Sequence, residues 1–351
     1  MTDMSRAMGG GGEERGHCSP RLSERSARAD QVLPVGVIGV GYLGQHHARL
    51  YSQMAGVRLT GVVDPVADRA GAAARATGCS VFPDIARLAK EVKAVSIVVP
   101  TPLHHDTAIQ CLELGLDVLL EKPMTTTLEQ ADALIEAAER RGAVLQIGHL
   151  ERFNGAVLAV EPFLTTPRFI ESHRLGPFME RGTDVDVVLD LMIHDIDMVL
   201  SLVRSPVEEI RAVGVPVLSS QVDIANARIE FANGCAANVT ASRVSKDKMR
   251  KIRVFQPDTY ISIDYQKQDA VVYRRAIEGG QPKIVFEPLR IQKDEPLKVE
   301  LESFVRAVTQ RTTPVVSGRD GREALRVALE VVAAMERSMQ RLTGQAPRGA
   351  R

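Results

Sequence analysis

Hydrophobic and polar positions follow a clear pattern from Val32 to about Leu150. Short apolar runs alternate there with stretches of helical period. Runs such as VSIVV and DVLL are almost wholly apolar, as is typical of strands covered on both faces. The pattern predicts a doubly wound parallel sheet. Strands are expected at 35–40, 59–64, 80–82, 94–99, 117–120 and 144–147, and helices at 43–54, 66–77, 84–91, 104–114 and 128–141.

After residue 203 the pattern changes to polar and apolar alternation with short turns. Asn233-Gly234 is a strong hairpin signal. Strands are expected at 207–217, 222–231, 235–245, 251–256, 259–265, 270–276 and 283–288, followed by helices at 297–310 and 319–342. We therefore predict an α/β chain with an N-terminal Rossmann domain and a C-terminal α+β domain that contains a large, mostly antiparallel sheet.

The domain boundaries follow from the same patterns. The Rossmann domain is predicted at 32–150 and the α+β domain at 151–343. Residues 1–31 carry four consecutive glycines, five arginines and few large apolar side chains, so we expect a disordered tail. Residues 344–351 are expected to fray.

Between the two patterns, residues 184–203 predict an amphipathic helix. On a helical wheel the polar residues Asp186, Asp190, His194 and Asp197 share a narrow arc. The opposite side carries Leu189, Met192, Ile196, Val199, Leu200 and Val203. We expect the apolar side to face the core and the polar side to face solvent. Four titratable groups on one arc also make this helix a candidate for catalysis.

Composition narrows the classes of function. The 44 basic and 44 acidic residues give zero formal net charge, which does not favour nucleic acid or an acidic membrane surface as a partner. The four cysteines are scattered without metal-ligand spacing, which is typical of a reducing compartment. No apolar run reaches the roughly 18 residues of a spanning helix, and the first 30 residues lack a secretory signal. We expect a cytoplasmic protein without membrane insertion.

A glycine-rich turn directly after the first predicted strand indicates a dinucleotide site. Gly39 is expected to make the tight turn, Gly41 to admit the pyrophosphate, and Gly44 to allow close packing of helix on strand. Tyr42 and Leu43 complete the loop at the helix N-terminus, which favours phosphate. At the end of the second strand, Asp64 is placed to bind the adenosine ribose hydroxyls, which favours NAD over NADP.

The ends of the next two core strands supply further candidates. Thr101 and His104 follow the fourth strand and are predicted to contact the nicotinamide half of the cofactor. Glu121 and Lys122 end the fifth strand, and Pro123 makes a fixed bend after them. A lysine at this edge points its ammonium toward the cleft.

Four motifs occur in the order GVIGVGYLGQHHAR, TPLHH, EKP and DLMIHDID, and together they resemble the glucose-fructose oxidoreductase, inositol dehydrogenase and rhizopine catabolism (Gfo/Idh/MocA) family. The resemblance covers nearly the whole predicted ordered chain. It implies a catalytic set of Lys122, Asp190 and His194, an N-terminal Rossmann domain and a C-terminal mixed sheet. It also implies homodimers or homotetramers that form through the open faces of those sheets.

The wording GHLERFNGAV at 148–157, together with 183–197, resembles the branch that oxidises C3 of UDP-N-acetylglucosamine. That branch supplies a keto sugar to an aminotransferase for lipid A synthesis. Gly155 stands where the family more often has proline. The candidate substrate-binding residues are Arg152, Arg174 and Asp197, with Arg243 as a further cation for the diphosphate.

Oxidation of a secondary alcohol requires a base, a hydride acceptor and a group that stabilises the alkoxide. We assign the base to His194, the orientation of its ring to Asp190, and alkoxide stabilisation to Lys122; which of Lys122 and His194 takes the proton stays open. Other sugars or inositols are alternative substrates. Two further alternatives are a metalloenzyme with Asp190, His194 and Asp197 as ligands, and a non-catalytic NAD-binding regulator.

Overall fold

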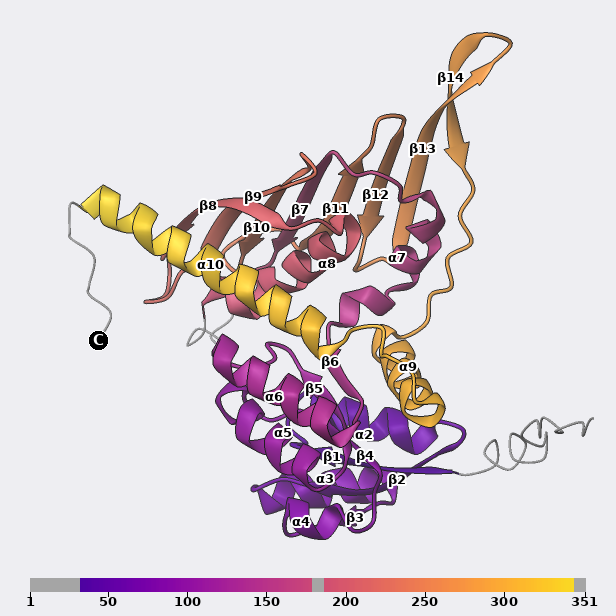
Figure 1. The fold of residues 1–351 in the computed structure, drawn as a ribbon, viewed down its shortest axis with the longest axis vertical. Coiled ribbons are helices and arrows are strands. Elements are labelled where there is room, and N and C mark those ends of the chain that lie inside the picture. The colour runs from indigo at the N-terminus through magenta and orange to yellow at the C-terminus, as the bar shows by residue number, and fades with distance from the viewer. Residues whose placement is uncertain (1–31, 179–185, 344–351) are drawn as a thin grey trace, which may run out of the picture. The chain divides into compact units, whose positions relative to one another are not determined.

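The structure is a computed structural model that describes residues 32–178 and 186–343. The tails predicted at 1–31 and 344–351 lie outside the described residues, as does the start of the helix predicted at 184. From Leu33 onward the described chain forms one compact unit built on two sheets, as Figure 1 shows. The predicted fold class is confirmed.

The first sheet is parallel and has six strands in the order β3-β2-β1-β4-β5-β6. The strand order reverses between β1 and β4, and open α/β sheets bind ligands at the carboxyl ends of strands at such a point. The strands are β1 (Leu33–Ile38), β2 (Val57–Val63), β3 (Ser80–Val81), β4 (Ala94–Ile97), β5 (Asp117–Glu121) and β6 (Leu145–Gly148).

Helices cover both faces of this sheet, as the fully apolar strands predict. One apolar core joins the sheet to α4 (Ile85–Leu88), α5 (His104–Glu113) and α6 (Leu128–Arg141). The other joins it to α2 (Gly44–Gln53) and α3 (Ala67–Thr77).

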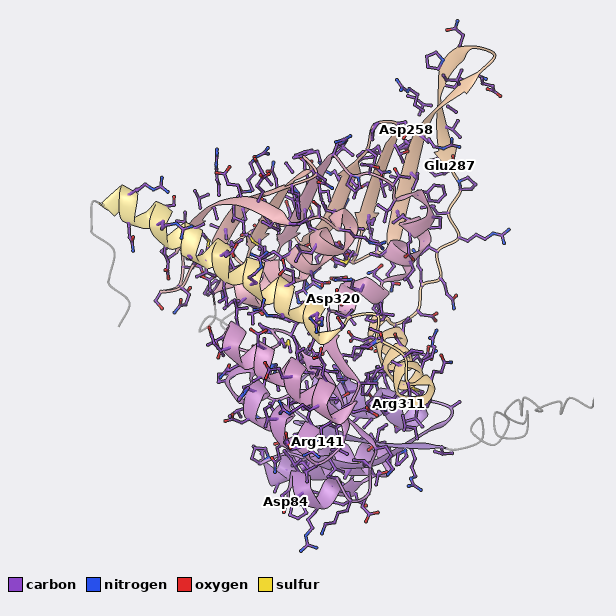
Figure 2. The ribbon with its side chains drawn as sticks, in the orientation of Figure 1. Asp84, Arg141, Asp258, Glu287, Arg311 and Asp320 are labelled. Atoms are coloured by element: carbon purple, nitrogen blue, oxygen red, sulfur yellow. The ribbon has the colours of Figure 1, made fainter. Side chains whose placement is uncertain are left out.

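Helix α9 (Pro296–Gln310) comes from the second half of the sequence but packs on the first sheet. Its fully buried Leu301 and Phe304 belong to the same core as Val35 of β1. At the end of α9, Arg311 Nη1 donates to Asp117 Oδ2 at 2.6 Å, which fastens α9 to the start of β5; Figure 2 labels this arginine. The C-terminal half of the chain therefore helps to position the strand that carries Lys122.

The second sheet has eight strands in the order β14-β13-β12-β11-β7-β10-β9-β8. Only the β7 and β10 pair is parallel among the pairs of this sheet in the described residues. The strands are β7 (Phe169–Leu175), β8 (Val207–Val215), β9 (Ile224–Phe231), β10 (Ala236–Ser242), β11 (Met249–Phe255), β12 (Thr259–Asp264), β13 (Asp269–Glu278) and β14 (Gln281–Glu287).

Helices cover one face of the second sheet and leave the other open. The covered face packs against α7 (Gly155–Val160), α8 (Ile193–Val203) and α10 (Gly318–Thr343) in one apolar core. On the open face a row of neighbouring aromatic rings crosses five strands, with centroids 5.2 to 6.2 Å apart and most pairs tilted. The row is Phe169, Phe255, Tyr260, Tyr273 and Phe286.

Strand β7 and the short helix α7 were not predicted from the sequence. In β7 the inward positions include Ser172 and Arg174, while Glu171 and His173 lie on the open face. Polar side chains thus occupy both faces, and the apolar alternation that identified the other seven strands is absent. The hairpin predicted at Asn233-Gly234 is confirmed, because β9 and β10 pair across it and Gly234 has φ +79°.

The closing helices match their predictions within a residue at each end. A search of the described residues finds no helix that combines the length and the hydropathy needed to cross a membrane.

Candidate active site

The glycine-rich turn has the geometry that a dinucleotide cradle needs. Gly39 has φ +84°, and a Cβ there would lie 2.7 Å from the Val98 carbonyl oxygen. A Cβ on Gly44 would lie 1.8 Å from the Gly39 carbonyl oxygen, so only glycine lets α2 begin there. A Cβ on Gly41 would meet nothing within 4 Å, so the space in front of this backbone is open. These residues fit a bound pyrophosphate.

Asp64 connects the end of β2 to this turn. Its Oδ2 accepts a hydrogen bond from the Val40 backbone N–H at 2.8 Å, and its Oδ1 accepts one from Val66 at 2.9 Å. Each carboxylate oxygen keeps capacity for a further donor. The side chain is partly exposed beside the loop. Its contact with the ribose hydroxyls stays a prediction.

The remaining predicted cofactor residues lie along the same edge of the sheet, with one exception. Tyr42 and Leu43 are 61% and 47% exposed at the start of α2, and Thr101 begins a short 3-10 turn after β4. His104 is the exception, because it is buried and both ring nitrogens lie against backbone carbonyls, of Pro123 at 2.8 Å and of Val99 at 2.9 Å. The prediction that His104 contacts the cofactor is therefore corrected: its ring fastens the Lys122-Pro123 bend, whose peptide bond is cis.

Lys122 and Asp190 meet at the junction of the two sheets. The Lys122 Nζ donates to the main-chain carbonyl oxygen of Asp190 at 2.8 Å and lies 3.8 Å from its Oδ1. Burial lowers the pKa of Lys122, while the Asp190 and Glu121 charges raise it and leave a net decrease. Asp190 lies in a π-helical turn, Val188–Met192, directly before α8. Such turns are uncommon and occur often at functional sites.

His194 follows in the first turn of α8. Its Nδ1 is buried and has no hydrogen-bond partner in the described residues. Burial, and then the positive charge of Lys122, hold the pKa of His194 well below its ordinary value, so the ring is neutral. No hydrogen bond or ion pair joins it to the Asp190 carboxylate among the described contacts. The prediction that Asp190 orients His194 is wrong in this geometry, because Asp190 contacts Lys122 instead.

The expected solvent-facing side of this helix is also corrected. Asp197, which was predicted on the polar arc, is only 1% exposed, because the covered face of the second sheet and the segment after β6 enclose α8. Asp195, outside the predicted arc, is 0% exposed. Ser172 Oγ donates to Asp195 Oδ1 at 2.7 Å. Arg152 donates to both oxygens of Asp197, each at 2.7 Å. The prediction assumed a regular α-helix with 100° per residue. It therefore included neither the π-helical turn nor these buried partners.

Two arginines predicted to bind substrate are engaged in such internal pairs. Arg174 is 3% exposed, and it donates to Asp195 Oδ2 at 2.5 Å and to Glu151 Oε1 at 2.9 Å. We correct its predicted role, because a guanidinium held by two buried carboxylates is a structural cation. Arg152 is bound to Asp197 and also lines a cavity of about 910 Å³ with Asp320 and Glu323. A substrate contact by Arg152 or Asp197 stays a prediction.

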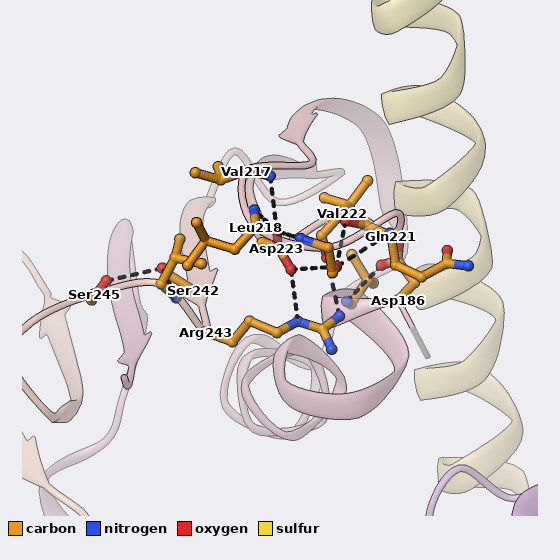
Figure 3. Close-up of polar contacts among 12 residues, drawn as sticks. Asp186, Val217, Leu218, Gln221, Val222, Asp223, Ser242, Arg243 and Ser245 are labelled. Carbon is orange, nitrogen blue, oxygen red and sulfur yellow. Dashed lines mark hydrogen bonds and ion pairs between the residues drawn. The ribbon is translucent and has the colours of Figure 1, made fainter. Parts of the chain in front are cut away.

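The third cation, Arg243, lies in a separate network with Asp223, close to Asp186 before the π-helical turn, as Figure 3 shows. Its Nη2 donates to the Val222 carbonyl at 3.1 Å, and its Nε lies 3.5 Å from Asp223 Oδ1. Burial alone would raise the pKa of Asp223, but hydrogen bonds from Ser219 and from backbone N–H groups lower it strongly. Arg243 therefore stabilises a loop of the second sheet.

Arg250 is a further candidate for substrate binding that the sequence alone did not indicate. It lies in β11 opposite Arg174, and strand alternation places it on the covered face with the buried Ile252. It is exposed at the rim, has no hydrogen bond or ion pair in the described residues, and its charge lowers the pKa of His194. Its position in a strand, on the same face as the buried Ile252, could have identified it. The strand predicted at 251–256 began one residue too late to include it.

Glu121 and His47 form a contact near Lys122 that the sequence did not predict. Glu121 Oε1 lies 3.3 Å from His47 Nε2, and its Oε2 accepts the Lys122 backbone N–H at 3.2 Å. Burial alone would raise the pKa of Glu121, but the contact with His47 and the Lys122 charge lower it. Glu121 is therefore an anion, directly before Lys122.

Gly155, the departure from the expected proline, has a local steric reason. A Cβ at this position would lie 2.0 Å from the Gln292 carbonyl oxygen. Asn154 before it caps α7 by accepting the Ala156 N–H at 3.1 Å and donates to the Tyr265 carbonyl at 3.0 Å. The backbone at Gln292 thus passes so close to the start of α7 that position 155 requires glycine.

The sequence matches two family profiles in consecutive order. Residues 33–149 match the oxidoreductase family, NAD-binding Rossmann fold, and residues 152–261 match the GFO/IDH/MocA C-terminal domain. The chain belongs to the Gfo/Idh/MocA oxidoreductase family. Within this family it is 39% identical, over 88% of its length and 99% of the relative, to UDP-N-acetylglucosamine 3-dehydrogenase from Acidithiobacillus ferrooxidans.

Solved structures and a second relative agree with this Gfo/Idh/MocA assignment. A crystal form of the same Acidithiobacillus ferrooxidans enzyme superposes with a TM-score of 0.81 at 38% identity, covering 86% of this chain and 97% of that one. The scyllo-inositol 2-dehydrogenase (NAD(+)) of Bacillus subtilis is 28% identical over 84% of this chain and 91% of its own. A nicotinamide cofactor and an oxidoreductase activity on CH–OH groups follow from this family and from the fit of the glycine turn.

The alternative metal site is not formed by the described residues. Asp190 contacts Lys122, whereas Asp197 is held by Arg152. No group of three or more His, Cys, Asp or Glu side chains in the described chain has an arrangement that could hold a metal ion.

Proposed function

We propose that this protein oxidises C3 of UDP-N-acetylglucosamine to a ketone with NAD as the hydride acceptor. The single observation that carries the proposal is the meeting of Lys122 with the Asp190 turn and His194, at the edge where the glycine-rich turn lies. The 39% identity to a UDP-N-acetylglucosamine 3-dehydrogenase over nearly all of that relative supports the substrate.

The choice of NAD over NADP rests on Asp64. Its carboxylate, fixed by the Val40 and Val66 N–H groups, matches a pair of ribose hydroxyls and repels a 2′-phosphate. With the pyrophosphate of NAD at the glycine turn, the nicotinamide ring would supply the acceptor for the hydride from the substrate carbon.

Within this mechanism we assign proton acceptance to Lys122 rather than to His194. A catalytic base works best with a pKa near the operating pH. Burial lowers the pKa of Lys122 from a high value, which increases the share of neutral amine. The pKa of His194 is already well below its ordinary value, which makes that ring a weak acceptor. His194 is then suited to hydrogen-bond the reacting hydroxyl and orient it.

Asp190 positions Lys122 in this scheme. Its carbonyl oxygen holds the Nζ at 2.8 Å, and its carboxylate at 3.8 Å stabilises the ammonium that forms after proton transfer. A neutral lysine has two N–H donors, so it keeps its bond to the Asp190 carbonyl while its lone pair accepts the substrate proton.

We assign diphosphate recognition to Arg250. Arg174 and Arg243 are held by buried carboxylates, whereas Arg250 lies at the rim on the covered face without an ionic partner in the described residues. Arginine suits phosphate because its planar guanidinium makes two parallel hydrogen bonds.

The cellular setting is part of the same proposal. A 3-keto nucleotide sugar is a substrate for an aminotransferase, which places this reaction in amino-sugar synthesis for lipid A, in the cytoplasm. We also propose a homodimer or homotetramer formed through the open face of the second sheet, where Tyr273 and Phe286 are 42% and 56% exposed.

An inositol or another free sugar is the second candidate substrate, because several inositol dehydrogenases are among the relatives. A purely regulatory NAD-binding role is the alternative of another class. Retention of Lys122 and His194 in one cluster favours catalysis over that role.

The decisive experiment measures absorbance of reduced nicotinamide after the purified protein is mixed with NAD or NADP and one alcohol at a time. The alcohols are UDP-N-acetylglucosamine, free N-acetylglucosamine and inositols, with an aminotransferase and glutamate added to trap a keto product. A signal with NAD and only the nucleotide sugar is expected. A signal only with inositol would overturn the substrate, and bound NAD without turnover on any alcohol would favour a regulator.

A further inference from the structure

His149 is a buried ring beside the catalytic lysine, and the proposed reaction does not yet use it. Gly148 of β6 pairs with Glu121 of β5, so His149 and Lys122 are the first residues beyond two paired strand ends. Neighbouring strands lie about 4.8 Å apart, so the two residues begin side by side at the same edge of the sheet. The Lys122 charge is near enough to lower the pKa of His149. His149 is 1% exposed.

Neither ring nitrogen of His149 has a hydrogen-bond partner among the described residues. A buried polar group without a partner costs roughly 1–3 kcal/mol, so such groups are uncommon away from functional sites. His104 provides the contrast within this chain, because its two nitrogens are both placed against backbone carbonyls. His104 thus has the contacts of a structural histidine, whereas the His149 nitrogens make no hydrogen bond in the described residues.

Behind the ring stands an oriented carboxylate. Asp197 Oδ2 lies 4.0 Å from His149 Nδ1, and both oxygens of Asp197 accept hydrogen bonds from Arg152. Arg152 thereby fixes the carboxylate on the Nδ1 side. The Nε2 side stays available for another group.

We propose that His149 is a proton-relay residue that takes the proton from Lys122 after Lys122 has removed it from the substrate hydroxyl, with Asp197 stabilising the imidazolium. This inference rests on the proposed dehydrogenase function. His149 does not touch the substrate in this proposal; it acts through Lys122, as a positioning residue that receives the proton from the lysine.

The proton and electrons balance in three steps. The substrate O–H bond breaks and an N–H bond forms on Lys122, while the electron pair of the C3–H bond leaves with the hydride to the nicotinamide. An N–H bond of Lys122 then breaks and one forms on His149. The proton finally passes to water when the product leaves, and both side chains return to their neutral forms.

The charges around His149 suit a ring that accepts a proton only briefly. Burial is the largest effect and lowers its pKa; Arg152 and Lys122 lower it further. Asp197 and Glu121 oppose them and raise it. The resting ring is therefore neutral, and the Asp197 carboxylate lowers the cost of the transient imidazolium.

The test compares His149→Ala with Lys90→Ala, a substitution at an exposed position of the first domain, far from the proposed site and from the open sheet face. For His149→Ala we expect kcat to fall by about 10- to 100-fold with KM changed less than about threefold. NADH affinity, measured by fluorescence, should stay the same. Added imidazole should restore part of the rate in proportion to its neutral form, and the Lys90→Ala control should match the wild type.

A second variant keeps the test decisive if His149→Ala does not fold. His149→Gln keeps polar volume but cannot carry a proton, so its kcat should be as low, with no rescue by imidazole. Wild-type kcat in either variant, a loss confined to KM, or a loss of kcat in His149→Ala that imidazole does not restore would overturn the relay. An inactive wild type would instead overturn the proposed function itself.

A measurement without turnover gives an independent readout. The NMR signal of the His149 ring, assigned by its absence in His149→Gln, should titrate at lower pH in Asp197→Asn than in the wild type. That direction follows because the Asp197 charge raises the pKa of His149. An unchanged titration would contradict the carboxylate–imidazole pairing.

Discussion

The Lys122 ammonium donates a hydrogen bond to the main-chain carbonyl oxygen of Asp190, 68 residues further along the chain, at 2.8 Å. This contact joins the carboxyl edge of the first sheet to the π-helical turn before α8. It holds the lysine by a backbone atom, so the side chain at position 190 tunes the charge of Lys122 without being its only anchor. The proton acceptor of the proposed reaction is therefore placed by the fold.

Lys122→Met and His194→Asn should each lower kcat by roughly 10²-fold or more, because each removes a group that acts on the reacting hydroxyl. NADH affinity should change little, since the glycine turn and Asp64 remain. Steady-state kinetics and NADH fluorescence check both points. The matched control is Lys90→Met, an exposed lysine of the first domain. Near-wild-type turnover in both variants would remove this site assignment.

The rate of oxidation should rise with pH through the lowered pKa of Lys122, because only the neutral amine accepts the substrate proton. The midpoint of this rise in kcat should lie below the ordinary lysine pKa of 10.5. Asp190→Asn should move the rise to lower pH, since the Asp190 charge raises that pKa. A pH profile of kcat that kept the same rise in Lys122→Met would assign the titration to another group.

Arg250→Ala should raise KM for the nucleotide sugar by about tenfold or more, because a charge-assisted hydrogen bond contributes about 1.5–3 kcal/mol. The kcat value should change little. Arg140→Ala is the control, because Arg140 is exposed on α6 of the first domain, paired with Glu113 at 3.5 Å. Equal KM values for the two variants would exclude Arg250 from diphosphate binding.

Arg174→Met should destabilise the fold by about 3–5 kcal/mol, because it leaves the buried carboxylates of Asp195 and Glu151 without their cation. Denaturant unfolding measures the change. Arg228→Met, in an exposed pair with Glu230, should have little effect. A selective rise in KM without lost stability would restore the substrate-binding role first predicted for Arg174.

Phe286→Asp should reduce the oligomer mass in solution, because it places a charge in the aromatic row of the open sheet face. Light scattering coupled to size exclusion reads the mass directly. Leu114→Asp, an exposed position on the first domain, is the control and should leave the mass unchanged. An oligomer that survives Phe286→Asp would place the interface elsewhere.

The sequence by itself determined the fold class and the elements of the first sheet, because strands buried on both faces are recognisable as apolar runs. It also determined the glycine turn, since Gly39 and Gly44 are required by backbone geometry. Local motifs located Lys122, Asp190 and His194 as candidates, because each lies at a strand end or on one helix.

Only the tertiary structure decided which side chains meet. Helical spacing paired Asp190 with His194, but the π-helical turn and the approach of β5 pair Asp190 with Lys122. Long-range packing pairs Arg174 with Asp195 and Glu151 and leaves Arg250 exposed, although neither residue lies in a strand predicted from the sequence. Likewise, the burial of His149 next to Lys122 depends on the pairing of β5 with β6, which no local pattern specifies. Partner choice depends on distances between segments far apart in the chain, and those distances exist only once the chain has folded.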